Sequence, residues 1–127
     1  MKIAALDIGR RKTGIGWVDL DTKIILPGEI IRHKTEIDFL EQILKFISNK
    51  HIEKVIVGVP NYPDPTSLQS YQYQLGQILS REIVVEYIDE SLTTLEAREL
   101  LSEHNIQTNN EDIEAAMIIL ERYMGNS

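Results

Sequence analysis

The sequence predicts an α/β fold in which helices flank a mixed five-stranded sheet. Short runs rich in Val and Ile alternate with longer segments of helical periodicity. The first three runs are separated by turns too short for a helix, which favours an antiparallel meander. Helical segments separate the later runs and are long enough to cross between parallel strands. The expected order of elements is therefore β-β-β-α-β-α-β-α-α.

The first three strands are expected at residues 2–7, 13–19 and 23–32. Residues 2–7 are apolar almost throughout, which is typical of a central strand buried on both faces. A turn around residues 19–22 joins the second and third strands. These strands form the predicted meander.

Helices and strands then alternate along the rest of the chain. Thr35 is a candidate N-cap for a helix to Asn49, whose apolar stripe consists of Ile37, Leu40, Ile43, Leu44 and Ile47. The remaining elements are expected as strands at 54–59 and 83–88, a loop at 61–67, and helices at 68–80, 93–103 and 111–123. Neither a repeat nor a linker divides them, so we expect a single domain over residues 1–127.

Composition excludes several classes of protein. No apolar run approaches the ~20 residues of a membrane span, and the start has no signal-peptide layout, so we expect a cytoplasmic protein without a membrane partner. The absence of cysteine excludes disulfides and thiolate metal sites. The three histidines lack metal-like spacing and are expected at the surface or at helix caps. A net charge of −7 argues against a broad basic coat, but not against a local basic patch.

The most informative segment is the end of the first strand. Asp7 is followed by Gly9 and by three cations, Arg10, Arg11 and Lys12. A hairpin turn needs glycine, and Asp often opens tight turns, so a structural role alone could explain Asp7. A carboxylate beside clustered cations is also what a metal ion and a polyanion would require where they meet.

Acidic residues collect at two further places. Asp89 and Glu90 follow the strand at 83–88, and Asp112 opens the last helix. Each has a structural explanation, because the first pair precedes a T-x-x-E capping box and acids stabilise the first turn of a helix. Carboxyl ends of parallel strands meet at one edge, however, so these acids could converge with Asp7. Three such carboxylates can hold one or two Mg²⁺ or Mn²⁺ ions for phosphodiester hydrolysis.

Four motifs occur along the chain in order. They are D-I-G-R-R-K-T-G at 7–14, V-G-V-P at 57–60, D-E-S-L-T-T-L-E-A at 89–97 and D-I-E-A-A-M-I-I-L-E-R-Y at 112–123. Together they resemble the YqgF/RuvX family of RNase H-like proteins, named as Holliday junction resolvases and as nucleases that mature the 5′ end of pre-16S rRNA. The resemblance covers nearly the whole chain.

The resemblance implies an RNase H-like fold in which Asp7, Glu90 and Asp112 are the catalytic and metal-binding triad, with Mg²⁺ or Mn²⁺ as cofactor. Asp89 is then a structural or supporting neighbour. The chain departs from the family in lacking two sources of cations. Ser91 stands where the family usually has Arg, and no Lys or Arg occurs after residue 60 until residue 81.

The leading hypothesis is therefore a metal-dependent nuclease in 5′-end maturation of pre-16S rRNA, with Arg10, Arg11 and Lys12 holding the backbone phosphate. A Holliday junction resolvase and a non-cleaving RNase H-like nucleic-acid-binding module remain as alternatives. The glycine-rich turn is also similar to the phosphate loop of actin-like ATPases and sugar kinases, but 127 residues leave no room for their second lobe. Paired cuts by a resolvase require two active sites, so a homodimer is one of the alternatives for the oligomeric state.

Overall fold

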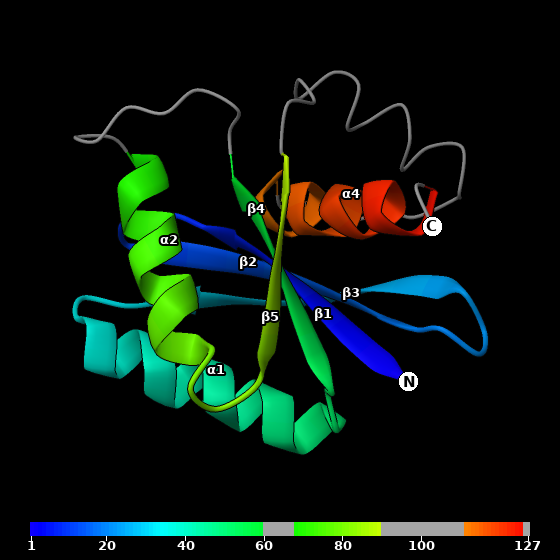
Figure 1. The fold of residues 1–127 in the computed structure, drawn as a ribbon, viewed down its shortest axis with the longest axis horizontal. Helices are drawn as coiled ribbons and strands as arrows, with labels where there is room; N and C mark the ends of the chain where they lie inside the picture. The colour runs from blue at the N-terminus through cyan, green and yellow to red at the C-terminus, as the bar shows by residue number, and fades with distance from the viewer. Residues whose placement is uncertain (60–67, 90–110, 126–127) are drawn as a thin grey trace.

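The computed structural model describes residues 1–59, 68–89 and 111–125. Its strands are β1 (Lys2–Ile8), β2 (Lys12–Asp19), β3 (Ile24–Arg32), β4 (Lys54–Val59) and β5 (Val84–Asp89). Its helices are α1 (Glu36–Lys50), α2 (Leu68–Leu79) and α4 (Glu111–Gly125) (Figure 1). None of these described helices is long and apolar enough to cross a membrane.

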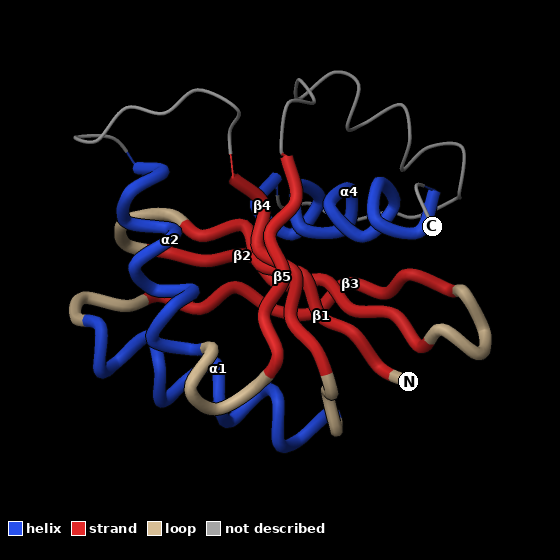
Figure 2. Tube along the Cα trace, viewed as in Figure 1, coloured by secondary structure: helices blue, strands red, loops and turns tan. Residues whose placement is uncertain are grey.

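The strands form one sheet in the order β3-β2-β1-β4-β5. β1 and β2 are antiparallel, as are β2 and β3, whereas β1, β4 and β5 are parallel to one another. Figure 2 shows these strands twisting past one another between the helices. The predicted mixed sheet with an opening meander is confirmed, and the carboxyl ends of β1, β4 and β5 share one edge.

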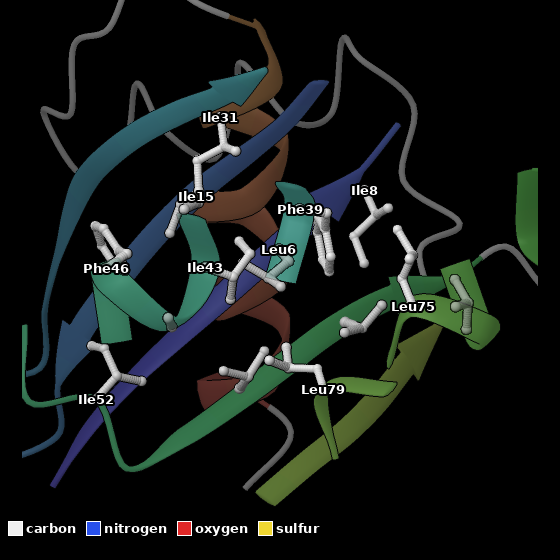
Figure 3. Packing of buried hydrophobic residues seen from close by; sticks show 14 residues of the cluster. Leu6, Ile8, Ile15, Ile31, Phe39, Ile43, Phe46, Ile52, Leu75 and Leu79 are labelled. Carbon is white, nitrogen blue, oxygen red and sulfur yellow. The ribbon is translucent and has the colours of Figure 1, made fainter. Parts of the chain in front are cut away.

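Helices cover both faces of the sheet. α1 and α2 pack on one face and α4 on the other (Figure 1). Successive side chains of a strand point to opposite faces, so Ala4 and Leu6 of β1 join the core under α1, while Ile3 and Ala5 join the core under α4. Figure 3 shows the first of these cores, where Leu6 lies near Phe39 of α1. Burial on both faces explains why β1 is apolar almost throughout.

The helix α1 begins at the predicted N-cap, but the residues that it buries differ in part from the predicted apolar stripe. The Thr35 side chain accepts a 3.1 Å hydrogen bond from the N–H of Asp38, which confirms the predicted N-cap. The buried residues of the helix are Phe39, Ile43 and Phe46. Placing Ile37 in the buried stripe is wrong, because its side chain is 71% exposed. Ile37 lies about 200° around the helix from Phe39, so it faces away from the sheet.

The remaining element predictions agree with the structure wherever the chain is described. Each predicted strand and helix in this part of the chain is present, and the boundaries differ by at most two residues. The predicted helix at 93–103 and the predicted loop at 61–67 lie outside the described residues. Local periodicity was therefore sufficient to find the elements that carry the site.

Candidate active site

Asp7 lies near the end of β1, on the face of the sheet that α4 covers. Alternate residues of a strand share a face, so Asp7 follows Ile3 and Ala5, which are buried against α4. In the sheet register, Asp7 pairs with Gly14 of β2. The predicted position of Asp7 at a strand end is thereby confirmed.

Glycines in β2 allow α4 to approach the sheet closely. A Cβ on Gly14 would overlap the backbone carbonyl of Asp112 and lie 2.9 Å from the Asp112 Cβ. A Cβ on Gly16 would lie 2.9 Å from Cγ of Met117, five residues further along α4 than Asp112. Because Gly14 is also the register partner of Asp7, this close approach places the first turn of α4 beside Asp7.

Asp7 and Asp112 line one pocket of about 550 Å³. The other residues that line it are Ile8, Gly9, Arg10, Arg11, Lys12 and Arg32. The structure therefore brings together two of the three predicted acids and all three predicted cations. Within the pocket, Nζ of Lys12 lies 2.9 Å from Oδ2 of Asp112, an ion pair that the sequence analysis did not anticipate.

Contacts on both sides hold the basic turn between β1 and β2. The carbonyl of Arg11 accepts a 2.9 Å hydrogen bond from the backbone N–H of His33, just after β3. The Arg10 guanidinium lies 5.9 Å from the centre of the Tyr71 ring on α2, within the range of a cation–π contact. The turn is thus tied to its neighbours and presents its cations from a fixed backbone.

Arg32 is a fourth cation of the pocket that the sequence analysis missed. It ends β3 and pairs with Lys12 in the sheet register. The predicted meander already indicated the position of Arg32, because an antiparallel third strand ends beside the start of the second strand. Placing Arg32 beside the basic turn still requires the register, which strand patterns alone do not supply.

The second acidic position follows β5. Val59 of β4 pairs with Asp89, the last residue of β5, at the edge where β1 also ends. Neighbouring strands are about 4.8 Å apart, so β5 lies roughly 10 Å from β1 across this edge. Glu90, the predicted third member of the triad, lies outside the described residues.

The donor set of the pocket fits a hard divalent cation. Asp7 and Asp112 offer carboxylate oxygens, the ligands that Mg²⁺ and Mn²⁺ prefer. The Lys12 ammonium group already lies against one of these carboxylates, so the site accommodates positive charge. Across the described residues, no group of three or more His, Cys, Asp or Glu side chains is arranged to bind a metal.

His33 is buried, so the expectation of a surface or capping role is wrong for this histidine. Its side chain is 2% exposed, and its Nε2 shares a 2.8 Å hydrogen bond with the hydroxyl of Thr13. Its ring packs edge-on against Phe39, with centroids 5.1 Å apart. Burial lowers the pKa of His33 below the ordinary 6.5, and the negative charge of Asp38 opposes part of this shift. His51, in contrast, caps α1 as expected.

We expect the burial of His33 to make stability depend on pH below neutrality. The unfolded chain binds a proton near pH 6.5, whereas the folded protein binds it only at the lower pKa of His33. The contribution of His33 to the free energy of unfolding is therefore fully present above pH 6.5. It is lost as the pH falls from 6.5 toward the pKa of His33 in the folded protein, by at most about 1.4 kcal/mol per pH unit. Urea unfolding of the wild type and of His33→Gln from pH 5 to 8 measures this. Equal pH slopes for the two proteins would contradict the assignment.

Comparisons with known proteins agree with the resemblance seen in the sequence. A model of the RuvX family, described as Holliday junction resolvase, matches residues 1–126. A protein of Sulfurovum sp. (strain NBC37-1) is 30% identical over 127 residues, which cover 98% of each chain. One of Malacoplasma penetrans (strain HF-2) is 29% identical and covers 98% of this chain and 94% of its own. Both carry the name "Putative pre-16S rRNA nuclease".

Solved structures with the same architecture are more distant in sequence. RuvC of T. thermophilus in complex with a Holliday junction substrate has a TM-score of 0.70 at 14% identity, covering 100% of this chain and 96% of that one. The Holliday junction resolvase of fowlpox virus has a TM-score of 0.66 at 13% identity, covering 100% of both chains. At these identities the likeness concerns the fold alone, and it confirms the RNase H-like fold that the resemblance implied.

Proposed function

Because the chain belongs to the RuvX family, we propose that it hydrolyses phosphodiester bonds with a divalent metal at the pocket that contains Asp7 and Asp112. The observation that carries the proposal is the meeting of these two carboxylates with the cations of the basic turn in one pocket. Two carboxylates brought together repel each other unless positive charge compensates them. A metal-dependent site that must also receive a phosphate accounts for both kinds of residue.

In this proposal Asp7, Asp112 and Glu90 hold one or two Mg²⁺ or Mn²⁺ ions through carboxylate oxygens. The bound metal supplies Lewis acidity at the scissile phosphodiester. Asp7 on a central strand and Asp112 on a helix packed over that sheet fix where the phosphate must lie. Arg10 and Arg11 bind the nonbridging phosphate oxygens and stabilise the negative charge that develops on them.

Lys12 has a more specific role than the two arginines. Its ion pair with Asp112 compensates this carboxylate before a metal binds. The Asp112 oxygen that Lys12 contacts is one of the same oxygens that would hold a divalent cation. Lys12, whose side chain is 49% exposed, could then turn from Asp112 to the phosphate and add a third cation to those of Arg10 and Arg11.

We propose the 5′ end of precursor 16S rRNA as the substrate, by analogy with the names of the two relatives. This role places the protein in the cytoplasm, where ribosome precursors are processed. The second candidate is a four-way DNA junction, which the description of the family favours. Both substrates present the same phosphodiester group to the pocket. They differ in the assembly they require, because a junction needs paired cuts by a homodimer and the rRNA does not.

Parallel cleavage assays distinguish the two substrates. The purified protein is incubated with Mn²⁺ and either an RNA that contains the precursor 5′ end or a four-way DNA junction, and its mass in solution is measured. We expect cleavage of the RNA, an intact junction and a monomeric enzyme. Cleavage of the junction alone by a dimer would favour the resolvase. Metal-independent binding without cleavage of either substrate would favour the non-cleaving module.

A further inference from the structure

A second pocket, of about 610 Å³, adjoins the candidate active site at the basic turn. Its lining residues are Arg10, Arg11, Arg32, His33, Lys34 and Asp38. The first three of these, called here the shared arginines, also line the pocket that contains Asp7 and Asp112. The two pockets are therefore joined by guanidinium groups. Each has the volume of an ordinary ligand site.

The residues special to each pocket lie on different sides of the sheet. Asp7 and Asp112 belong to the side that α4 covers. The ring of His33 packs against α1, and Lys34 and Asp38 lie at the start of that helix. A polymer that crosses the shared arginines would thus pass from the α4 side of the sheet to the α1 side.

The cations of the second pocket outnumber its one acid, Asp38. Neither Lys34 nor any of the shared arginines forms an ion pair with another described residue. Asp38 is engaged locally, because it accepts a 2.9 Å hydrogen bond from the Gln42 side chain and a 3.3 Å one from the Lys34 N–H. Four cations against one carboxylate leave this place with an excess of positive charge, in contrast to the net charge of −7 of the whole chain. Such a patch attracts a polyanion.

Hydrogen bonds beneath the second pocket hold its backbone in place. The hydroxyl of Thr13 bonds the buried ring of His33 at 2.8 Å, and the His33 N–H bonds the carbonyl of Arg11 at 2.9 Å. The side-chain amide of Gln42 donates to the carbonyl of Arg32 at 2.7 Å. These contacts tie the end of β3 to the basic turn and to α1. A ligand would therefore meet a preorganised site, which reduces the entropy lost on binding.

We propose that Arg32 and Lys34 bind a backbone phosphate of the same nucleic-acid strand that is cut in the neighbouring pocket. This inference rests on the proposed nuclease function. A strand fits better than a free nucleotide, because the shared arginines connect the second pocket directly to the site of cleavage. Guanidinium and ammonium groups bind phosphate strongly without reading base sequence. The second pocket would therefore set the path of the strand rather than its sequence.

The test measures binding without cleavage. A labelled RNA with the precursor 5′ end is titrated in EDTA, over a series of salt concentrations, with the wild type and with Arg32→Gln/Lys34→Gln. Both replaced side chains are exposed, so the variant should keep its fold and melting temperature. Loss of two phosphate contacts should lower the slope of log K against log salt by about 1.4 and weaken binding at 50 mM salt by roughly tenfold or more.

Lys45→Gln/Arg81→Gln is the matched control, because it removes the same charge from exposed positions outside both pockets. Its binding and salt slope should stay close to those of the wild type. If wild-type protein cleaves RNA with Mn²⁺ but both double variants bind alike, the second pocket is not part of the strand path and the proposed function stands. If the wild type neither binds nor cleaves the RNA, both proposals fail together.

Discussion

Replacing Asp7 by Asn should abolish metal-dependent cleavage while leaving the fold intact. Asn has nearly the same shape but removes the charge that the proposed metal requires. A metal contributes several kcal/mol to such a reaction, so its loss corresponds to roughly 10³-fold or more in rate. Asp7 shares its pocket with both Asp112 and cations, so the electrostatic effects of losing its charge oppose each other and the melting temperature should change little. Cleavage rates with Mn²⁺ and thermal melting measure the two effects.

Asp21→Asn is the matched control for this variant. Asp21 lies in the turn between β2 and β3, and its carboxylate is 86% exposed. This turn lies at the opposite end of β2 from the site, and the length of β2 places the two roughly 25 Å apart. The control should retain wild-type cleavage. Wild-type rates for Asp7→Asn would refute the proposed metal site, whatever the behaviour of the control.

Replacing Gly14 by Ala should lower both stability and activity, because α4 would have to move away from the sheet. The new Cβ would overlap the Asp112 carbonyl, which is backbone and cannot rotate aside. Overpacking of this kind costs about 1–3 kcal/mol, or roughly 4–12 °C in melting temperature for a chain of this size. A shift of about 1 Å in Asp112 would cost on the order of 100-fold in cleavage rate. Thermal melting measures the first effect, and cleavage rates taken below the melting temperature of the variant measure the second.

Two other glycines provide graded controls for this effect. A Cβ on Gly16 would lie 2.9 Å from Cγ of the flexible Met117 side chain and 3.1 Å from the Met117 backbone nitrogen, a milder contact than the overlap at Gly14, so Gly16→Ala should cost less than Gly14→Ala. A Cβ on Gly125, at the end of α4, meets nothing within 4 Å, and Gly125→Ala should be neutral. No described glycine has a positive φ, so loss of space rather than backbone strain explains the ranking. Equal melting temperatures for Gly14→Ala and Gly125→Ala would show that α4 does not depend on this contact.

Local patterns predicted most of the described fold because they report which side of an element is buried. The apolar run at 2–7 indicated a strand covered on both faces, and two hydrophobic cores now account for it. Thr35 indicated a helix start because a hydroxyl can satisfy an N–H that the helix leaves free. The sequence pattern identified the buried face less well where apolar residues occur on several sides of one helix. Ile37 was assigned to the wrong side of α1 for this reason.

The sequence alone established the sheet with its opening meander, the place of Asp7 at a strand end and the three cations that follow it. Only the tertiary structure decided what these residues meet. It set Asp112 over Gly14, paired Lys12 with Asp112 and brought Arg32 beside the basic turn. The reason is physical: the periodicity of side chains reflects the local backbone, whereas strand register and the closeness of a helix to a sheet result from packing among segments far apart in the chain.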